Sequence, residues 1–259
     1  MSTKVCVLVS VGRHPRSGRP RRAALDAQAL ELGLRLADCE LDVVHVGNSK
    51  VALREYLGMG LTKLTVLPVP DEADVAPTLA TYLQTSKPDV VLTGKQAETG
   101  EDSGFLPYFL AEALGYALIC DVSKLALSEQ VVDVQQALPH GQRRAVRCST
   151  PVILTVGRGA PAARPCAFAR MRDGALVPTD CEFHLDRAAS GWSHSEAKPR
   201  PKRIVASKST DALERLNSIV SGPARRNRVL TGLDAANSAK AIHEDLIQHN
   251  AITSTRRSE

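Results

Sequence analysis

Short apolar runs alternate with helix-like stretches through the first 115 residues, and this alternation restricts the fold more than any other feature. The runs are rich in β-branched residues, as in KVCVLVSV at 4–11, which is typical of a strand buried on both faces of a parallel sheet. Each run is followed by apolar residues at helical spacing. The expected strands are 4–11, 40–47, 63–69 and 88–93, and the expected helices are 23–37, 49–59, 73–85 and 105–115.

Because a strand, a helix and a second strand form a right-handed βαβ unit, this order predicts an α/β fold with a doubly wound parallel sheet of Rossmann-like type. Ligands of such sheets bind beyond the carboxyl ends of the strands, where the strand order reverses. That rule places Ser10, Val46 and Gly94 near one crevice.

The alternation of strand-like and helix-like stretches ends after residue 115. Three shorter runs at 117–127, 130–138 and 142–148 predict an antiparallel ribbon, and 150–156 returns as a buried strand. A Pro/Gly/Arg-rich stretch at 13–22 predicts a basic loop, and a polar, Pro-rich stretch at 190–201 predicts an extended arm. A short strand at 202–206 and helices at 211–221 and 235–249 are expected to follow.

These C-terminal helices cannot bury themselves against a core of their own, which predicts a partner subunit. The expected organisation is a nucleotide-binding α/β domain at 1–189, and an arm with helices at 190–259 that packs on the partner.

The stretch from 90 to 115 carries the clearest chemistry. An apolar strand runs into a loop of glycines and small polar residues and then into a helix, which is a geometry that holds phosphate on backbone N–H groups at a positive helix end. Glycine allows a ligand close to the backbone, and Thr99 and Ser103 offer hydroxyls, Ser103 also as an N-cap. The alternative is a plain βα turn that serves packing alone. The residues expected to contact a nucleotide are Ser10, Asp26, Val46, Gly94, Lys95, Gln96, Ala97, Thr99, Gly100, Ser103 and Gly104.

Composition restricts the class of protein. The net charge of +5 would permit nucleic-acid binding, but the basic residues fall in separate groups and only 3% of residues are aromatic, so we expect no nucleic-acid partner. The six cysteines contain no CxxC pair, which argues against zinc and a disulfide framework. Without a long apolar run or a signal peptide after Met1, we expect a cytoplasmic protein with no membrane span.

An enzyme would need a nucleophile with a base, paired carboxylates or metal-ligand spacing. The seven histidines offer no such arrangement, and His45 is expected to be a satisfied or crevice-lining residue. Glu101 and Asp102 could hold Mg²⁺ beside a phosphate, although loop carboxylates are usually just solvated. We therefore expect neither a catalyst nor a resident metal.

Several segments resemble the electron transfer flavoprotein β subunit. The GKQA sequence at 94–97 with LAEALG at 110–115 is similar to the signature of that family, and the stretch 26–36 is similar to its DEIAVEEAVRL helix. Residues 53–60 resemble its LRxALAMGA segment, 151–156 its PAVVTV strand, and 164–171 its PRYxxLPxIM segment. The resemblance extends from Lys4 to about Pro178.

The resemblance implies an adenine nucleotide α-hydrolase-like fold and an electron carrier rather than an enzyme. It implies a heterodimer with an α subunit, FAD shared with that subunit, and either AMP or, as in bifurcating members, a second FAD in the crevice of this chain. Electrons would pass from flavin dehydrogenases towards a quinone reductase, with the flavin carrying the chemistry. Phe168 stands where the family has its docking leucine, and Arg164 opens the same segment as a second docking residue.

The chain also departs from the family pattern. The Asn-Pro-Phe before the first helix is replaced by residues 23–25 (AAL), the Asp of the QAxD motif falls at Thr99, and a loop Gln falls at about Gly104. The tyrosine that follows strand one is missing. We therefore expect binding mainly through backbone groups at 94–104. Two alternatives stay open, namely a stand-alone adenine-nucleotide-binding protein resembling universal stress proteins or hydrolases, and a homodimeric scaffold with a vestigial nucleotide site.

Overall fold

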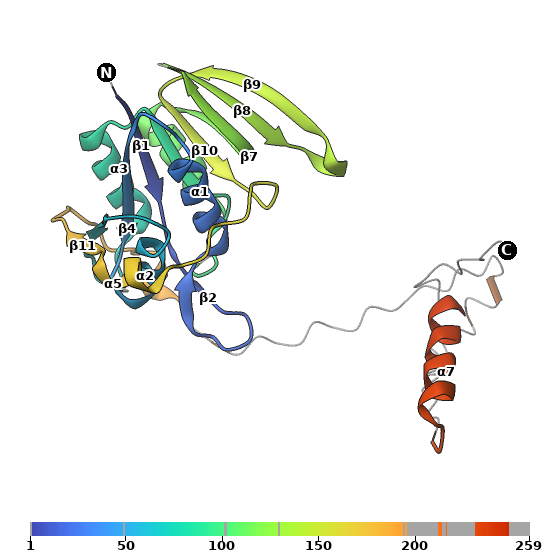
Figure 1. Cartoon of the computed structure of the whole chain (residues 1–259). Helices are drawn as coiled ribbons and strands as arrows, with labels where there is room; N and C mark the ends of the chain where they lie inside the picture. Colours follow the sequence, from blue (N-terminus) through green and yellow to red (C-terminus); the bar gives the residue numbers. More distant parts are fainter. Residues whose placement is uncertain are drawn as a thin grey trace. The chain divides into compact units, whose positions relative to one another are not determined.

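A computed structural model of the chain describes residues 2–48, 50–100, 103–128, 130–193, 195, 212–213, 216 and 231–248 (Figure 1). The chain divides into two compact units, residues 1–194 and 195–259, and each is considered by itself. In the second unit, helix α7 (Ala235–Gln248) confirms the helix expected there. The strand expected at 202–206 lies outside the described residues, as do most of the helix expected at 211–221 and the second half of the arm.

The first unit is built on one sheet with strand order β11-β5-β4-β1-β6-β10-β7-β8-β9. All pairings from β11 to β7 are parallel, and only β7-β8 and β8-β9 are antiparallel. The doubly wound parallel sheet and the antiparallel ribbon are therefore both confirmed. The strands are β1 (Thr3–Leu8), β4 (Cys39–Val46), β5 (Lys63–Leu67), β6 (Val90–Gly94), β7 (Ala117–Ser128), β8 (Val131–Ala137), β9 (Arg143–Ser149), β10 (Val152–Val156) and β11 (Ala175–Pro178).

Helices cover both faces of this sheet. Alternate residues of β1 enter two separate cores, with Val5 and Val7 in one, and Cys6 and Leu8 in the other. The first core contains side chains of α1 (Ala24–Leu34) and α2 (Lys50–Leu57), and the second contains side chains of α3 (Val75–Ser86) and α4 (Leu106–Leu114). The strand order reverses between β1 and β6, so the expected crevice lies at the carboxyl ends of these two strands.

The segment after β1 differs from the expectation. Strand β1 ends at Leu8 rather than near residue 11, and the basic stretch forms a hairpin of β2 (Val11–Arg13) and β3 (Pro20–Arg22) instead of an open loop. The prediction was wrong because Pro and Gly mark the turn of a short hairpin as readily as a longer loop. Figure 1 shows this hairpin projecting beyond the end of the sheet.

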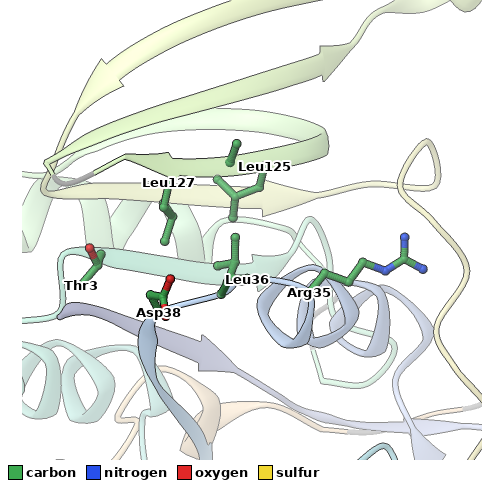
Figure 2. Close-up of a pocket in the computed structure, with 8 residues that line it drawn as sticks. Thr3, Arg35, Leu36, Asp38, Leu125 and Leu127 are labelled. Carbon is green, nitrogen blue, oxygen red and sulfur yellow. The ribbon is translucent and has the colours of Figure 1, made fainter.

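Strand β7 bends along its length. Its ladder to β8 shifts register between Val122 and Lys124, and Asp121 just before the shift has a φ of 56°. Beyond the bend, Leu125 and Leu127 point towards Leu36 and the start of β1, and together they border a pocket of about 510 Å³ (Figure 2). This pocket lies at the amino end of β1, so it is remote from the crevice and contains none of the predicted site residues.

Candidate functional site

Asp26 ties together the ends of β1 and β6. It is the third residue of α1 and is only 4% exposed. One carboxylate oxygen accepts hydrogen bonds from the backbone N–H of Ser10 at 2.7 Å and from its hydroxyl at 2.5 Å. The other accepts from the backbone N–H of Gly94 at 3.1 Å. Three of the predicted site residues are thus brought together at the reversal of strand order.

The protonation of Asp26 reflects its burial. Loss of solvent raises the pKa of this carboxyl from 3.8 to about 6, although the hydrogen bonds from Ser10 and Gly94 oppose the shift. Both carboxylate oxygens of Asp26 accept hydrogen bonds from within the protein, so Asp26 links the chain just after β1, at Ser10, to the end of β6, at Gly94. We call this arrangement of Asp26, Ser10 and Gly94 the clasp.

Gly94 has a different role from the one expected. A Cβ at this position would overlap the Asp26 carboxylate and lie 3.0 Å from the Cβ of Leu25. The space beside Gly94 is thus filled by the start of α1, which corrects the interpretation that this glycine clears room for a ligand. Gly94 permits the close approach of helix and strand.

The loop after β6 is anchored at several points. The Lys95 backbone N–H donates to the Val156 carbonyl at 2.9 Å, and the Lys95 ammonium pairs with Asp121 at 2.8 Å. The Thr99 hydroxyl donates to the Val11 carbonyl at 2.8 Å. Each of these contacts joins the loop to a different element, so residues 95–99 are anchored at the end of the sheet.

Glu98 completes this anchoring and was not among the predicted residues. Its carboxylate accepts the backbone N–H of Ala24 at 2.7 Å, at the start of α1, and pairs with Arg21 of the hairpin at 3.0 Å. Sequence reasoning missed it because one contact depends on a hairpin that was not expected, and the other joins residues 74 positions apart in the chain. A carboxylate at a helix N-terminus is favourable in itself.

Two loop glycines require their residue type. Gly100 has a φ of 80° and Gly104 a φ of 69°, which L side chains rarely adopt. No atom of the described residues lies within 4 Å of a Cβ built at Gly100, so nothing in the described chain covers this backbone against a ligand. Ser103 is not the N-cap of α4, since Phe105 holds that position without a side-chain cap. The Ser103 hydroxyl instead accepts from the Phe105 backbone N–H at 3.3 Å.

A small pocket opens at this loop. Its volume of about 170 Å³ is below the roughly 300 Å³ of a site for a whole small molecule, and it suits a group such as a phosphate. Sequence reasoning missed Tyr108, which is half exposed on α4, and Thr155, which is buried on β10. The lining residues are Lys95, Gln96, Ser103, Gly104, Tyr108 and Thr155, of which the first four were predicted.

The remaining predicted residues lie nearby. Val46 ends β4, the strand next to β1, and Ala97 is half buried in the loop. His45 is buried, with its Nδ1 at 2.9 Å from the Val9 carbonyl oxygen, and burial lowers its pKa. This fits the interpretation of His45 as a satisfied residue.

The two predicted docking residues differ in their surroundings. Phe168 begins helix α5 (Phe168–Asp173) and is 73% exposed. Arg164 instead pairs with the buried carboxylate of Glu31 at 2.7 Å, and Arg35 pairs with the same carboxylate. Burial opposes ionisation of Glu31, but these arginines outweigh it and lower its pKa to about 2. Arg164 therefore holds the segment after β10 on α1.

The described part of the chain meets neither the requirements of a metal site nor those of a membrane-spanning helix. No cluster of His, Cys, Asp and Glu side chains there is suited to a metal ion, and Glu101 and Asp102 lie outside the described residues. None of the described helices has the length and apolar character to cross a bilayer.

Comparison with known proteins agrees with this architecture. The model of the electron transfer flavoprotein domain matches residues 19–177. The electron transfer flavoprotein subunit beta of Chromohalobacter salexigens is 42% identical over 248 residues, which cover 92% of each chain. The residues matched by the family model include Asp26, the loop after β6 and the Phe168 segment. The chain belongs to the electron transfer flavoprotein β-subunit family.

Proposed function

We propose that the chain pairs with an α subunit, and that the two hold FAD at their interface. The flavin would accept electrons from flavin-dependent dehydrogenases and pass them towards a quinone reductase. The observation that carries this proposal is the 42% identity to a β subunit along nearly the whole chain. The protein supplies orientation and electrostatics, while bound flavin supplies the redox chemistry.

We further propose that the crevice between β1 and β6 holds AMP or a second FAD. Both ligands contain an adenosine phosphate, and the small pocket at residues 95–104 has the size for the phosphate. The open backbone at Gly100 and the hydroxyl of Ser103 provide groups of the kind that bind phosphate. Lys95 would add a cation, at the expense of its pair with Asp121.

Two separate surfaces are proposed for two different partners. Phe168 is a large apolar side chain that lies mostly in solvent, as expected for a residue that docks a redox partner. In the other unit, Ile242 is 62% and Leu246 39% exposed, one helical turn apart on α7. We propose that residues 190–259 form the arm that packs on the α subunit, and that residues 1–189 form the nucleotide-binding domain.

Gly100→Val should release the nucleotide of this crevice while leaving the sheet folded. The valine would crowd the backbone that faces the phosphate, and its positive φ would cost about 1–2 kcal/mol. Gly115→Val is a matched control, because Gly115 also has a positive φ of 68° in open space but caps the far end of α4. Nucleotide content by mass spectrometry and circular dichroism of both variants provide the test.

Loss of nucleotide in the Gly100 variant alone would support the proposed site. A nucleotide retained at the wild-type level in Gly100→Val, or lost equally in both variants, would show that the site is elsewhere.

A further inference from the structure

The β2–β3 hairpin, residues 11–22, carries a cluster of cations at its tip. Arg13, Arg16 and Arg19 are exposed, and none of the ion pairs among the described residues involves them. In contrast, Arg21 at the base of the hairpin is half buried and paired with Glu98. The tip therefore presents three guanidinium groups to solvent.

The tip is an ordered turn. The imidazole Nδ1 of His14 accepts the backbone N–H groups of Arg16 at 3.3 Å and Ser17 at 3.2 Å. The backbone of His14 also bonds across the turn, donating to the Arg19 carbonyl at 2.9 Å and accepting from the Gly18 N–H at 2.8 Å. Since the backbone is already ordered, less conformational entropy is lost when the arginines bind a partner.

The hairpin base shares a support with the Phe168 segment. The Arg22 backbone N–H donates to Glu55 on α2 at 3.0 Å, and the Arg22 guanidinium donates to the Arg164 carbonyl at 3.0 Å. The residue before α5, Ala167, donates its N–H to the Gly58 carbonyl just after α2 at 2.9 Å. The hairpin that carries the cationic tip and the segment that carries the exposed Phe168 are thus both hydrogen-bonded to α2 or to the residue that follows it.

The chemistry of the tip points to carboxylates. Guanidinium groups form paired hydrogen bonds with carboxylate and with phosphate. A nucleic acid is less suited, because residues 11–22 include no Phe, Tyr or Trp for base stacking, the His14 imidazole is engaged in holding the turn, and the other basic groups do not continue the patch as a stripe. Acidic side chains clustered on a protein surface can pair with the same guanidinium groups, and this pairing needs neither base stacking nor a continuous basic stripe.

We propose that the hairpin tip docks a partner protein through a carboxylate-rich surface, beside the apolar contact of Phe168. That the partner is a redox protein rests on the function proposed above, whereas the preference for carboxylates rests on the hairpin alone. Charge pairs at such a surface mainly accelerate association and select the partner, and salt weakens them.

The test uses the full-length chain and a fluorescein-labelled oligoglutamate peptide, with binding followed by fluorescence anisotropy at increasing salt. One variant combines Arg13→Gln, Arg16→Gln and Arg19→Gln. The control combines Lys124→Gln, Arg143→Gln and Arg158→Gln, which remove the same charge from exposed positions on other elements. Circular dichroism verifies that both variants fold.

We expect the hairpin variant to bind the peptide about tenfold or more weakly at low salt, because it loses three exposed ion pairs with the peptide. The control should stay within about twofold of wild type. Equal weakening in both variants would overturn the proposal. The proposal would also be overturned if the wild-type chain bound a labelled single-stranded oligonucleotide more tightly than the peptide, and if that binding depended on the same three arginines. The assay needs neither flavin nor the α subunit, so failure of the proposed function would leave its result intact.

Discussion

Gly94→Val is expected to destabilise the chain by about 3 kcal/mol or more, because the new side chain has no space to occupy. Its Cβ would overlap the Asp26 carboxylate and press on Leu25, so either the start of α1 or the end of β6 must move. Neither can move freely, since β6 is buried between β1 and β10. Urea unfolding followed by circular dichroism measures the loss.

Gly191→Val is the comparison for this change. Among the described residues, no atom lies within 4 Å of a Cβ built at Gly191, and its φ is not positive. Its effect should remain within about 0.5 kcal/mol, as for most surface substitutions. If Gly94→Val were as stable as Gly191→Val, the packing of α1 against the end of β6 would not have the role assigned to it.

Asp26→Asn is expected to change how stability depends on pH. The folded protein holds the Asp26 proton more tightly than the unfolded chain does, with a pKa of about 6 instead of 3.8. The stability contributed by this proton is fully present below pH 3.8 and is lost as the pH rises through 6. The pKa difference corresponds to about 3 kcal/mol, and asparagine has no such dependence.

Asparagine should also weaken the clasp itself. Its side chain has a single acceptor oxygen, whereas both carboxylate oxygens of Asp26 receive backbone N–H groups, from Ser10 and Gly94. One buried donor would be left unpaired, at a cost of about 1–3 kcal/mol. The variant should therefore be less stable than wild type at pH 5, and the difference should shrink by about 1.4 kcal/mol towards pH 8.

Asp42→Asn serves as the control for this experiment. Asp42 accepts from the hydroxyls of Thr65 at 3.0 Å and Tyr82 at 2.7 Å, and hydroxyl groups can rotate towards the remaining oxygen. Urea unfolding at several pH values compares the three proteins. A constant difference between wild type and Asp26→Asn from pH 5 to 8 would contradict the titration of Asp26 in this range.

The fold was predictable from the sequence because each buried strand can be recognised from its own residues. A strand buried on both faces must be apolar at nearly every position, as β6 and β10 are, so its run is visible without knowing its neighbours. The helices between such runs then restrict the connections to parallel crossovers. The antiparallel ribbon was visible for the same reason, through short runs separated by turn residues.

The details of the site depend on contacts between distant residues, which pattern does not reveal. The Tyr56 hydroxyl donates to the Ser10 carbonyl at 2.7 Å and accepts from the Ala23 N–H at 2.8 Å, so a residue of α2 supports the same strand end as Asp26. Glu98 and Arg21 meet only because the hairpin folds back. Arg164 was expected to face a partner, yet the buried charge of Glu31 pairs with it.

The measurement that tests the central proposal most directly is purification of this chain after co-expression with a candidate α subunit. The visible spectrum and mass spectrometry of the released nucleotides would then be recorded. We predict a stable heterodimer with flavin absorption and FAD, accompanied by AMP or by a second FAD, with the ratio deciding between these two. A colourless chain that does not co-purify with the α subunit and binds only ATP would contradict the proposal and favour a stand-alone nucleotide-binding protein.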